Sequence, residues 1–468
     1  MTESMEELGE RLSRVAKIIM DTGEAANEAE ALAILSRYQV QLVFGENLGE
    51  MAQAALLTAA ASALPCLLGG VSYLGPDQPL RAGWRGHPDA PAPQNLAGAL
   101  EQLGVAAAAQ REPEVPCIVF GANTIGEGFG VRASFDGWTA AVMPLADPPL
   151  PEQGNCAPTA VLAGAMAVSE VFQHFRGTQP LATQRRIGWS LWEPWKPWRE
   201  AAIGPAVSVL PQSAWIVGLG NLGQAYLWTL GLLPHAPETL RLVLQEFDVI
   251  STANNSTSLL SRLIDVNRRK TRMAAAWAEH RGFTTALVER RFAANFTIDP
   301  EEPSVALIGV DNPATRRLIE RVGFARIIEA GLGRGPGDYL GITLHTFPAA
   351  RGAVDCWPEA TIERENSAQA ALKRSAYRQL EADSGDGCGV LRLAGRSVAT
   401  PFTGAVAGAM AIGELLRLCH GGVRVEFTSL HLAHADRATV IAGEPWAPFN
   451  PGLLLHAKGV RARQGRWA

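Results

Sequence analysis

Three glycines around residue 220 have the spacing that most directly indicates chemistry. Residues 214–217 (AWIV) form an apolar run typical of a buried parallel strand, and Gly218, Gly220 and Gly223 follow it as G-x-G-x-x-G. Glycines at this spacing allow a tight turn and let the backbone approach a phosphate. The apolar run after them predicts a helix whose N-terminal N–H groups point at that anion. The motif predicts a nucleotide site, but it does not separate a dinucleotide from ATP.

Acidic, amide and basic side chains follow the next expected strands. The strand RLVLQEFD ends in Glu246 and Asp248, where a carboxylate can bind a ribose hydroxyl. Asn254 and Lys270 precede the expected helix TRMAAAWAEH, and the strand SVALIGVDNP ends in Asp311. A lysine neutralises phosphate charge, and a carboxylate at a strand tip can hold a metal ion. This set predicts a site for Mg-ATP, because hydride transfer to a nicotinamide needs none of it.

In these residues the chain resembles the ubiquitin-activating and ThiF/MoeB superfamily of adenylating enzymes. The family pattern is a glycine loop, D-x-D, S-N-x-x-R, a lysine and a strand that ends in D-N, and residues 246–270 match it without a gap. The resemblance implies that ATP is bound by Gly218, Gly220, Gly223, Glu246, Asp248, Asn254, Lys270 and Asp311. It also implies that Asp311 holds Mg2+ and that Lys270 takes part in catalysis.

Two positions depart from this pattern. Glu246 replaces the first aspartate of D-x-D, which lengthens the side chain by one methylene and keeps its charge. The family's arginine falls on Thr257, which cannot neutralise phosphate charge. Arg262 and Arg268 are the expected substitutes, because both lie between Thr257 and the lysine.

The first half of the chain is similar to the second. VFGENLGEM aligns with VGLGNLGQA, and Glu46 then stands where Gly220 would approach a phosphate, so that its carboxylate would repel the anion. PCIVFGANT resembles VALIGVDNP with Asn123 in place of Asp311, and AGAMAVSE nearly repeats AGAMAIGE. We therefore predict an internal duplication. The expected fold is α/β, with two tandem Rossmann-like, ThiF-type adenylation domains: an inactive, degenerate one in residues 1–205 and an active one in residues 206–468.

The duplication gives Arg37 a predicted role. ILSRYQVQLVFG resembles the S-R-Q stretch of the family, whose arginine reaches into the ATP site of the partner unit. A positive charge from the inactive half would neutralise the triphosphate as pyrophosphate leaves. On this reading Arg37 is a catalytic residue.

Activating enzymes of the ubiquitin type also need a thiol that is exposed, mobile and able to ionise. Cys388 lies in the glycine-rich stretch DSGDGCGV, which we predict to be a mobile loop, and the segment after it resembles the family stretch that follows the crossover loop. Cys388 is the expected nucleophile and Cys356, in GAVDCWPEA, is the second candidate. The other cysteines fall in apolar stretches or at the head of the first Ala/Gly helix.

Composition excludes several other classes of protein. With 47% hydrophobic and 19% charged residues, the chain of 468 residues is expected to be globular and to form two or more domains. A net charge of −5 without a basic run argues against a nucleic-acid partner. The N-terminus lacks an apolar signal core, and the apolar run 54–68 is interrupted by Pro65, so we expect a cytoplasmic protein without a membrane span. Six cysteines without a C-x-x-C pair predict neither a disulfide framework nor a zinc site.

The resemblance is strongest to the bacterial ThiF-family activating enzymes of ubiquitin-like conjugation operons. It implies ATP and Mg2+ as cofactors, and a ubiquitin-like protein, a ubiquitin-conjugating enzyme and a JAB-type peptidase as partners in antiphage defence. The two halves would act as a pseudo-dimer within one chain. Three alternatives stay open: a sulfur-carrier-protein adenylyltransferase, an NAD-dependent oxidoreductase, and a non-catalytic scaffold.

Overall fold

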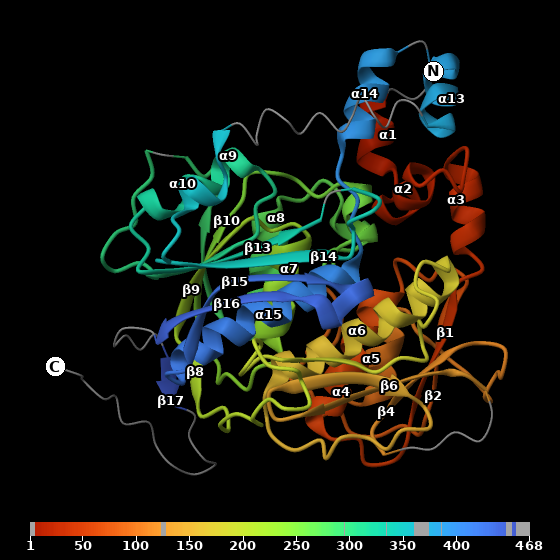
Figure 1. Ribbon diagram of the computed structural model, residues 1–468, viewed down its shortest axis with the longest axis horizontal. Coiled ribbons are helices and arrows are strands. Elements are labelled where there is room, and N and C mark those ends of the chain that lie inside the picture. The colour runs from red at the N-terminus through yellow and green to blue at the C-terminus, as the bar shows by residue number, and fades with distance from the viewer. Residues whose placement is uncertain are drawn as a thin grey trace.

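The computed structural model describes residues 5–122, 128–293, 295–333, 335–359, 374–384, 386–445 and 452–454. Two mixed sheets enclose a shared layer of helices (Figure 1). Asn123, the predicted counterpart of Asp311, lies outside the described residues, and the strand register corrects this prediction: Val119 corresponds to Ile308, which puts Ala122 at the position of Asp311.

The first half forms a seven-stranded sheet of order β3-β2-β1-β4-β5-β6-β7. Its strands are β1 (Gln39–Phe44), β2 (Gly70–Leu74), β3 (Ala106–Ala107), β4 (Cys117–Phe120), β5 (Gly130–Asp136), β6 (Thr139–Pro144) and β7 (Ile187–Ser190). Its helices are α4 (Glu50–Ala63), α5 (Leu96–Leu103) and α6 (Ala157–Arg176).

The second half forms an eight-stranded sheet of order β11-β10-β9-β12-β13-β14-β15-β16. Its strands are β9 (Ser213–Val217), β10 (Arg241–Gln245), β11 (Thr284–Val288), β12 (Val305–Ile308), β13 (Arg326–Leu332), β14 (Gly341–Phe347), β15 (Val423–His431) and β16 (Thr439–Pro445). Its helices are α7 (Asn221–Gly231), α8 (Lys270–His280), α9 (Pro313–Arg316), α10 (Ala353–Cys356), α13 (Ser375–Ser384), α14 (Gly387–Gly395) and α15 (Pro401–Cys419). A separate pair joins β8 (Val209–Pro211) to β17 (Gly452–Leu454).

The two sheets repeat one topology. β1 pairs in parallel with β2 and β4, as β9 does with β10 and β12. The β5–β6 and β6–β7 pairs are antiparallel, and so are the β13–β14 and β14–β15 pairs. The second sheet adds only β16 at its end. The predicted fold of two tandem Rossmann-like domains is therefore confirmed. The division at residues 205 and 206 stays a prediction.

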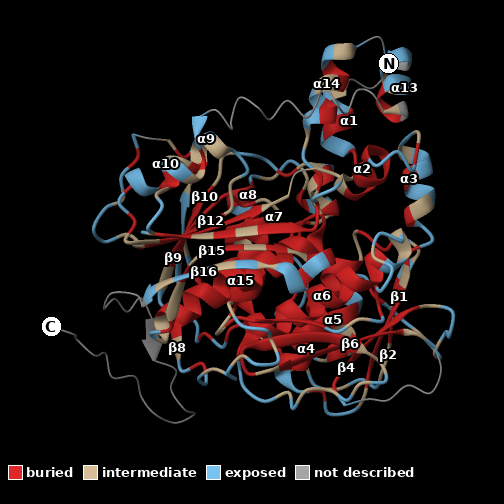
Figure 2. Cartoon of the chain, viewed as in Figure 1, coloured by how far each residue is buried: buried red, intermediate tan, exposed pale blue. Residues whose placement is uncertain are grey.

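The central layer explains why the AGAMA sequence occurs twice. Helices α4, α6, α7 and α15 lie between the sheets, and they are buried almost throughout (Figure 2). A Cβ on Gly164 of α6 would lie 2.2 Å from the Ala55 carbonyl oxygen of α4, and one on Gly408 of α15 would lie 2.7 Å from the Ala225 Cβ of α7. Both glycines let two helices approach closely. Among the described residues α15 is also the one helix apolar and long enough to span a membrane, and it is wholly buried.

The N-terminal helices precede the first sheet but pack against the second half. These are α1 (Met5–Arg11), α2 (Arg14–Asp21) and α3 (Glu28–Leu35). The backbone N–H of Arg14 donates to Ser256 Oγ at 2.9 Å, and Lys17 Nζ donates to the Ala394 carbonyl at 3.2 Å. In Figure 1 α1 and α2 stand beside α13 and α14 at the edge of the second half. The start of the chain thus reaches the region where the predicted site lies.

Candidate functional site

The glycine loop has the geometry that phosphate binding requires. Gly218 has φ +88°, and a Cβ there would lie 2.9 Å from the Gly309 carbonyl oxygen. A Cβ on Gly223 would lie 2.0 Å from the Gly218 carbonyl oxygen, so this glycine lets α7 pack on the strand. Gly220 caps the N-terminus of α7 and faces open space. The free N–H groups of α7 can therefore bind an anion that approaches Gly220.

A cavity of about 670 Å³ opens at this loop. It gathers most of the residues that the sequence predicts to bind ATP: Gly218, Gly220, Glu246, Asp248, Asn254, Lys270 and Asp311. A second cavity of about 1020 Å³ adjoins it and shares Asp248, Asn254, Lys270 and Asp311. Lys270 and Asp311 thus lie at the glycine turn, as an ATP site requires.

A lysine and two carboxylates lie together in the cavity. Lys270, at the start of α8, has its Nζ 3.3 Å from Asp248 Oδ2 and a side chain that is 11% exposed. Asp311 follows β12, is exposed to the cavity, and has no partner among the described residues. A free carboxylate is the kind of oxygen ligand that Mg2+ prefers, so Asp311 fits the predicted metal site.

Glu246 and Asn254 also stabilise the local backbone. Glu246 Oε2 accepts a hydrogen bond from the Leu219 N–H at 3.2 Å, which ties the end of β10 to the glycine loop. Asn254 Oδ1 accepts from the Ser251 N–H at 2.9 Å and caps the short 3₁₀ helix at residues 252–256. The extra methylene of Glu246 therefore still allows the carboxylate to reach the loop.

The arginines that line the cavity are not those that the sequence indicated. Thr257, which aligns with the family's arginine, lines the cavity but carries no charge. Arg262, Arg268 and Arg37 line neither of the two cavities, and Arg268 is bound to Asp265 at 2.8 Å. The arginines that do line the cavity at the glycine loop are Arg14, Arg290, Arg291 and Arg316.

Arg14 is the cation that the N-terminal helices bring to the site. It lines both cavities, its Nη2 donates to the Gly9 carbonyl at 3.1 Å, and its buried Nη1 has no hydrogen-bond partner among the described residues. Burial lowers the pKa of Arg14 to about 10, so the side chain stays charged at pH 7. Sequence reasoning missed Arg14 because only tertiary contacts bring the start of the chain to the glycine loop.

Two further arginines lie over aromatic rings at the ends of β10 and β11. The Arg291 guanidinium lies 4.2 Å from the centre of the Phe247 ring, and the Arg290 guanidinium lies 4.6 Å from that of Phe296. These positions follow the carboxyl ends of the strands, where nucleotides bind in sheets of this topology. The sequence did not indicate β11, because its residues TTALV are only partly apolar.

The prediction of a mobile loop at Cys388 is wrong. Cys388 is exposed in the first turn of α14, where the Asp386 side chain accepts from the Gly389 N–H at 2.8 Å and caps the helix. An apolar face of this helix, including Val390, is buried, so capping and packing outweigh the glycines. The helix ends at Gly395, which lines the larger cavity.

Cys356 has a different environment. It ends α10, it is half-buried against the aromatic core on the outer face of the second sheet, and it lines neither cavity. Burial raises the pKa of the Cys356 thiol, which reduces the thiolate fraction at pH 7.

The equivalent loop of the first half is closed by its own side chains. Gln78 Oε1 accepts from the Leu48 N–H at 2.6 Å, and Gln78 Nε2 donates to the Gly45 carbonyl at 3.1 Å. Glu46 is exposed at the position that aligns with Gly220. The backbone donor that would face a phosphate is therefore occupied, in agreement with a degenerate first domain.

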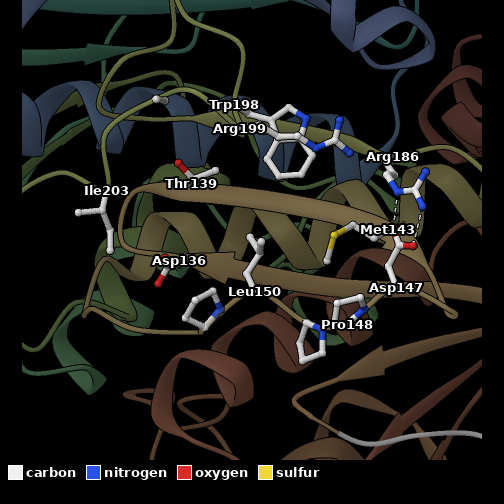
Figure 3. A pocket seen from close by; sticks show the side chains of 13 residues that line it. Asp136, Thr139, Met143, Asp147, Pro148, Leu150, Arg186, Trp198, Arg199 and Ile203 are labelled. Carbon is white, nitrogen blue, oxygen red and sulfur yellow. Dashed lines mark hydrogen bonds and ion pairs between the residues drawn. The ribbon is translucent and has the colours of Figure 1, made fainter.

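The first half has a separate hollow of about 540 Å³ beside β6 (Figure 3). Its charged groups have partners among the neighbouring residues: Arg186 binds Asp147 at 2.7 Å, Asp136 accepts from the Gln153 N–H at 3.1 Å, and the Arg199 guanidinium lies 4.4 Å from the Trp198 ring centre. It contains no glycine loop and no lysine, so it does not repeat the ATP-site pattern.

Two tandem domains of one topology, with one open glycine loop beside a lysine and acids, have the organisation expected of an E1-like protein. Residues 39–191 match the family described as the BilD N-terminal domain, and residues 210–422 match the BilD C-terminal domain. The bacterial E1-like protein BilD of Collimonas sp. is 39% identical over 425 residues, which cover 89% of this chain and 90% of that protein. The chain therefore belongs to the bacterial E1-like BilD family, and the resemblance stated from the motifs is confirmed.

Solved structures of E. coli MccB are also similar, at a lower level. MccB with ATP is 12% identical with a TM-score of 0.32, and MccB with succinimide is 10% identical with a TM-score of 0.32. Each match covers 50% of this chain and 63% of MccB, so the chain spans less than two thirds of the length of that protein.

Proposed function

We propose that the chain activates a ubiquitin-like protein at the cavity of its second half. The carrier's C-terminal carboxylate attacks the α-phosphate of ATP, which gives an acyl-adenylate and releases pyrophosphate. No strong base is needed, because a carboxylate is already ionised at pH 7. The observation that carries the proposal is that Lys270, Asp248 and Asp311 line one cavity with the open glycine loop.

Several residues of the chain contribute to neutralising the negative charge of the phosphates. Lys270 and Arg14 neutralise negative charge on the phosphates, and Asp311 would hold Mg2+, which would supply further positive charge at the phosphates. Arg14 comes from the N-terminal helices, so the inactive half still supplies a cation to the active one. It takes the role that the alignment gave to Arg37.

The second step uses Cys388. Its thiolate attacks the acyl carbonyl and AMP leaves with its electron pair, which gives a thioester that a conjugating enzyme's thiolate can then take over. Helix α14 links Cys388 to Gly395 at the larger cavity, and seven helical residues span roughly 10 Å. The exposure of Cys388 and the partial burial of Cys356 favour Cys388. A sulfur-carrier adenylyltransferase would share the first step and lack the thioester.

Exchange of pyrophosphate into ATP tests the first step. The purified chain should exchange labelled pyrophosphate only when a small carrier protein encoded beside its gene is present, and Asp311→Asn should lower the rate at least about tenfold. Tight NAD binding without exchange would instead indicate an oxidoreductase, and no nucleotide binding at all would indicate a scaffold. Cytoplasmic location and a role in antiphage defence stay predictions.

A further inference from the structure

On the outer face of each sheet, strand pairing aligns one residue from each of four neighbouring strands. At one position of this row, the two halves carry opposite charges. Strand pairing aligns the rows Val43, Val119, Arg132, Met143 in the first half and Val217, Ile308, Glu329, His345 in the second. The inactive domain thus has a buried arginine where the other domain has a buried glutamate. A buried charge needs a partner, so the buried arginine and the buried glutamate must be paired with different groups.

Glu329 holds an arginine from the neighbouring helix. It is 0% exposed, its Oε1 lies 3.0 Å from Arg316 Nε, and its Oε2 lies 2.9 Å from His345 Nδ1. The single Nε hydrogen of Arg316 is donated to the Val310 carbonyl at 2.9 Å, directly before Asp311, so the contact with Glu329 Oε1 is an ion pair and not a hydrogen bond. The Trp357 ring centre lies 5.8 Å from the guanidinium. Arg316 is therefore fixed on several sides, and its orientation is set by the strand beneath it.

In the first half, an arginine of the strand itself binds the carbonyl that is equivalent to that of Val310. Arg132 Nη1 donates to the Gly121 carbonyl at 2.7 Å, and Gly121 aligns with Val310. The guanidinium there comes from the strand itself, and Met143 lines the hollow of Figure 3 at the register of His345. Capping this turn therefore requires neither Glu329 nor an arginine on the helix. We therefore expect the glutamate and the helical arginine of the second half to have a role beyond capping this turn.

The difference places a guanidinium in the wall of the nucleotide cavity. Arg316 lines the cavity together with Asp311 and Gly333. A Cβ on Gly331 would lie 2.9 Å from Arg316 Nη1 and 3.1 Å from Nη2, so both nitrogens lie over the end of β13. An arginine presents a planar fork of donors that matches a carboxylate or a phosphate.

We propose that Arg316 binds an anionic oxygen of the two reacting groups, and that Glu329 and His345 are positioning residues that hold its guanidinium at the cavity wall. The anion is either the carrier's C-terminal carboxylate or a phosphate of ATP. Both are expected beside Asp311 in the proposed reaction, on which this inference rests. Glu329 also compensates the arginine's charge before the substrates arrive.

The test compares Arg316→Gln and Arg316→Lys with Arg317→Gln. Arg317 is the next residue, it bonds to the Trp357 carbonyl and to Glu359, and it lines neither cavity, so it is a matched control. We expect Arg316→Gln to lower kcat/KM for carrier-dependent pyrophosphate exchange by 10- to 100-fold, on the order of the 1.4 kcal/mol that each tenfold factor represents. Arg316→Lys should recover only part of this, and Arg317→Gln should stay within twofold.

Two readouts assign the anion. A raised KM for the carrier with an unchanged Kd for ATP alone identifies the carboxylate, whereas a weakened Kd for ATP identifies a phosphate. If Arg316→Gln keeps its Tm and changes neither quantity, the proposal is wrong, while carrier-dependent exchange by the unmodified chain would still support the proposed function. If the unmodified chain shows no exchange, the proposed function fails first.

A double-mutant cycle tests the positioning role of Glu329. Glu329→Gln keeps the size of the side chain and removes its charge, so it should reduce exchange in the same kinetic parameter as Arg316→Gln. The double variant should then be no worse than Arg316→Gln alone, because the two residues act as one unit. Additive losses would overturn the positioning role. If Glu329→Gln fails to fold, His345→Gln gives the same comparison at the other carboxylate oxygen.

Discussion

The two glycine-loop regions share their topology and differ in a few side chains. In the second half Gly218 and Gly220 leave the end of β9 open to a cavity. In the first half Phe44 stands at the position of Gly218, is 2% exposed and stacks on Tyr73 at 6.1 Å between ring centres, while Gln78 occupies the Leu48 N–H. On the proposed function, nucleotide binding depends on whether the loop is left empty, and not on the order of strands, which both halves keep.

The halves also depend on each other. The N-terminal helices bring Arg14 to the second half, and the Trp228 indole of α7 donates to Thr58 Oγ1 of α4 at 2.9 Å across the central layer. The inactive domain thus supports the active one through packing and through one cation. A domain that has lost its own site can be retained for these contributions.

The largest effect is expected when the residue of the inactive loop is transferred to the active one. Gly220→Glu places a carboxylate in open space beside the phosphate position, so the chain should fold while ATP affinity falls at least about 100-fold by charge repulsion. Gly220→Gln has the same length without the charge and should lose less. Calorimetric titration with ATP measures both, and equal losses would mean that bulk, rather than charge, distinguishes the two loops.

The thiol step gives the next largest change. Cys388→Ala should keep pyrophosphate exchange and abolish the carrier adduct that thiols cleave, because only the exposed cysteine of α14 lies on the helix that leads to the cavity. Gel analysis with and without reductant detects the adduct, and Cys356→Ala should retain it. An adduct that survives Cys388→Ala and disappears with Cys356→Ala would reverse this assignment.

The contribution of the N-terminal helices is tested at two arginines. Arg14→Ala should slow exchange by about 10- to 100-fold, since it removes a partly buried cation from the proposed phosphate cavity. Arg37→Ala should have little effect, because Arg37 lines neither cavity. Steady-state rates of pyrophosphate exchange, measured for both variants, show which arginine contributes. A loss with Arg37→Ala and none with Arg14→Ala would restore the assignment made from the sequence.

The smallest effect is expected in the inactive loop itself. Gln78→Ala leaves the buried Leu48 N–H unpaired and should lower the free energy of unfolding by about 1 to 3 kcal/mol. Its exchange rate at a stable temperature should equal that of the unmodified chain. Urea denaturation measures the first quantity. A loss of exchange without a loss of stability would indicate that the first half takes part in chemistry.

The sequence predicted the features that local spacing controls. The glycine loop, Lys270 and Asp311 lie on consecutive βα units, so their order along the chain brings them to one edge of the sheet. Arg14 and Arg316 were missed, because the first arrives from a distant helix and the second is oriented by a buried glutamate on the next strand, β13. The helix at Cys388 was mistaken for a loop, since glycine content was weighed above the capping aspartate.

Calorimetric titration of the full chain with Mg-ATP tests the central claim most directly. We expect one nucleotide bound per chain, because of the two aligned glycine loops only that of the second half is open. Lys270→Ala should remove or strongly weaken that binding without unfolding the protein. Two sites per chain, or one site that is indifferent to Lys270→Ala, would contradict it.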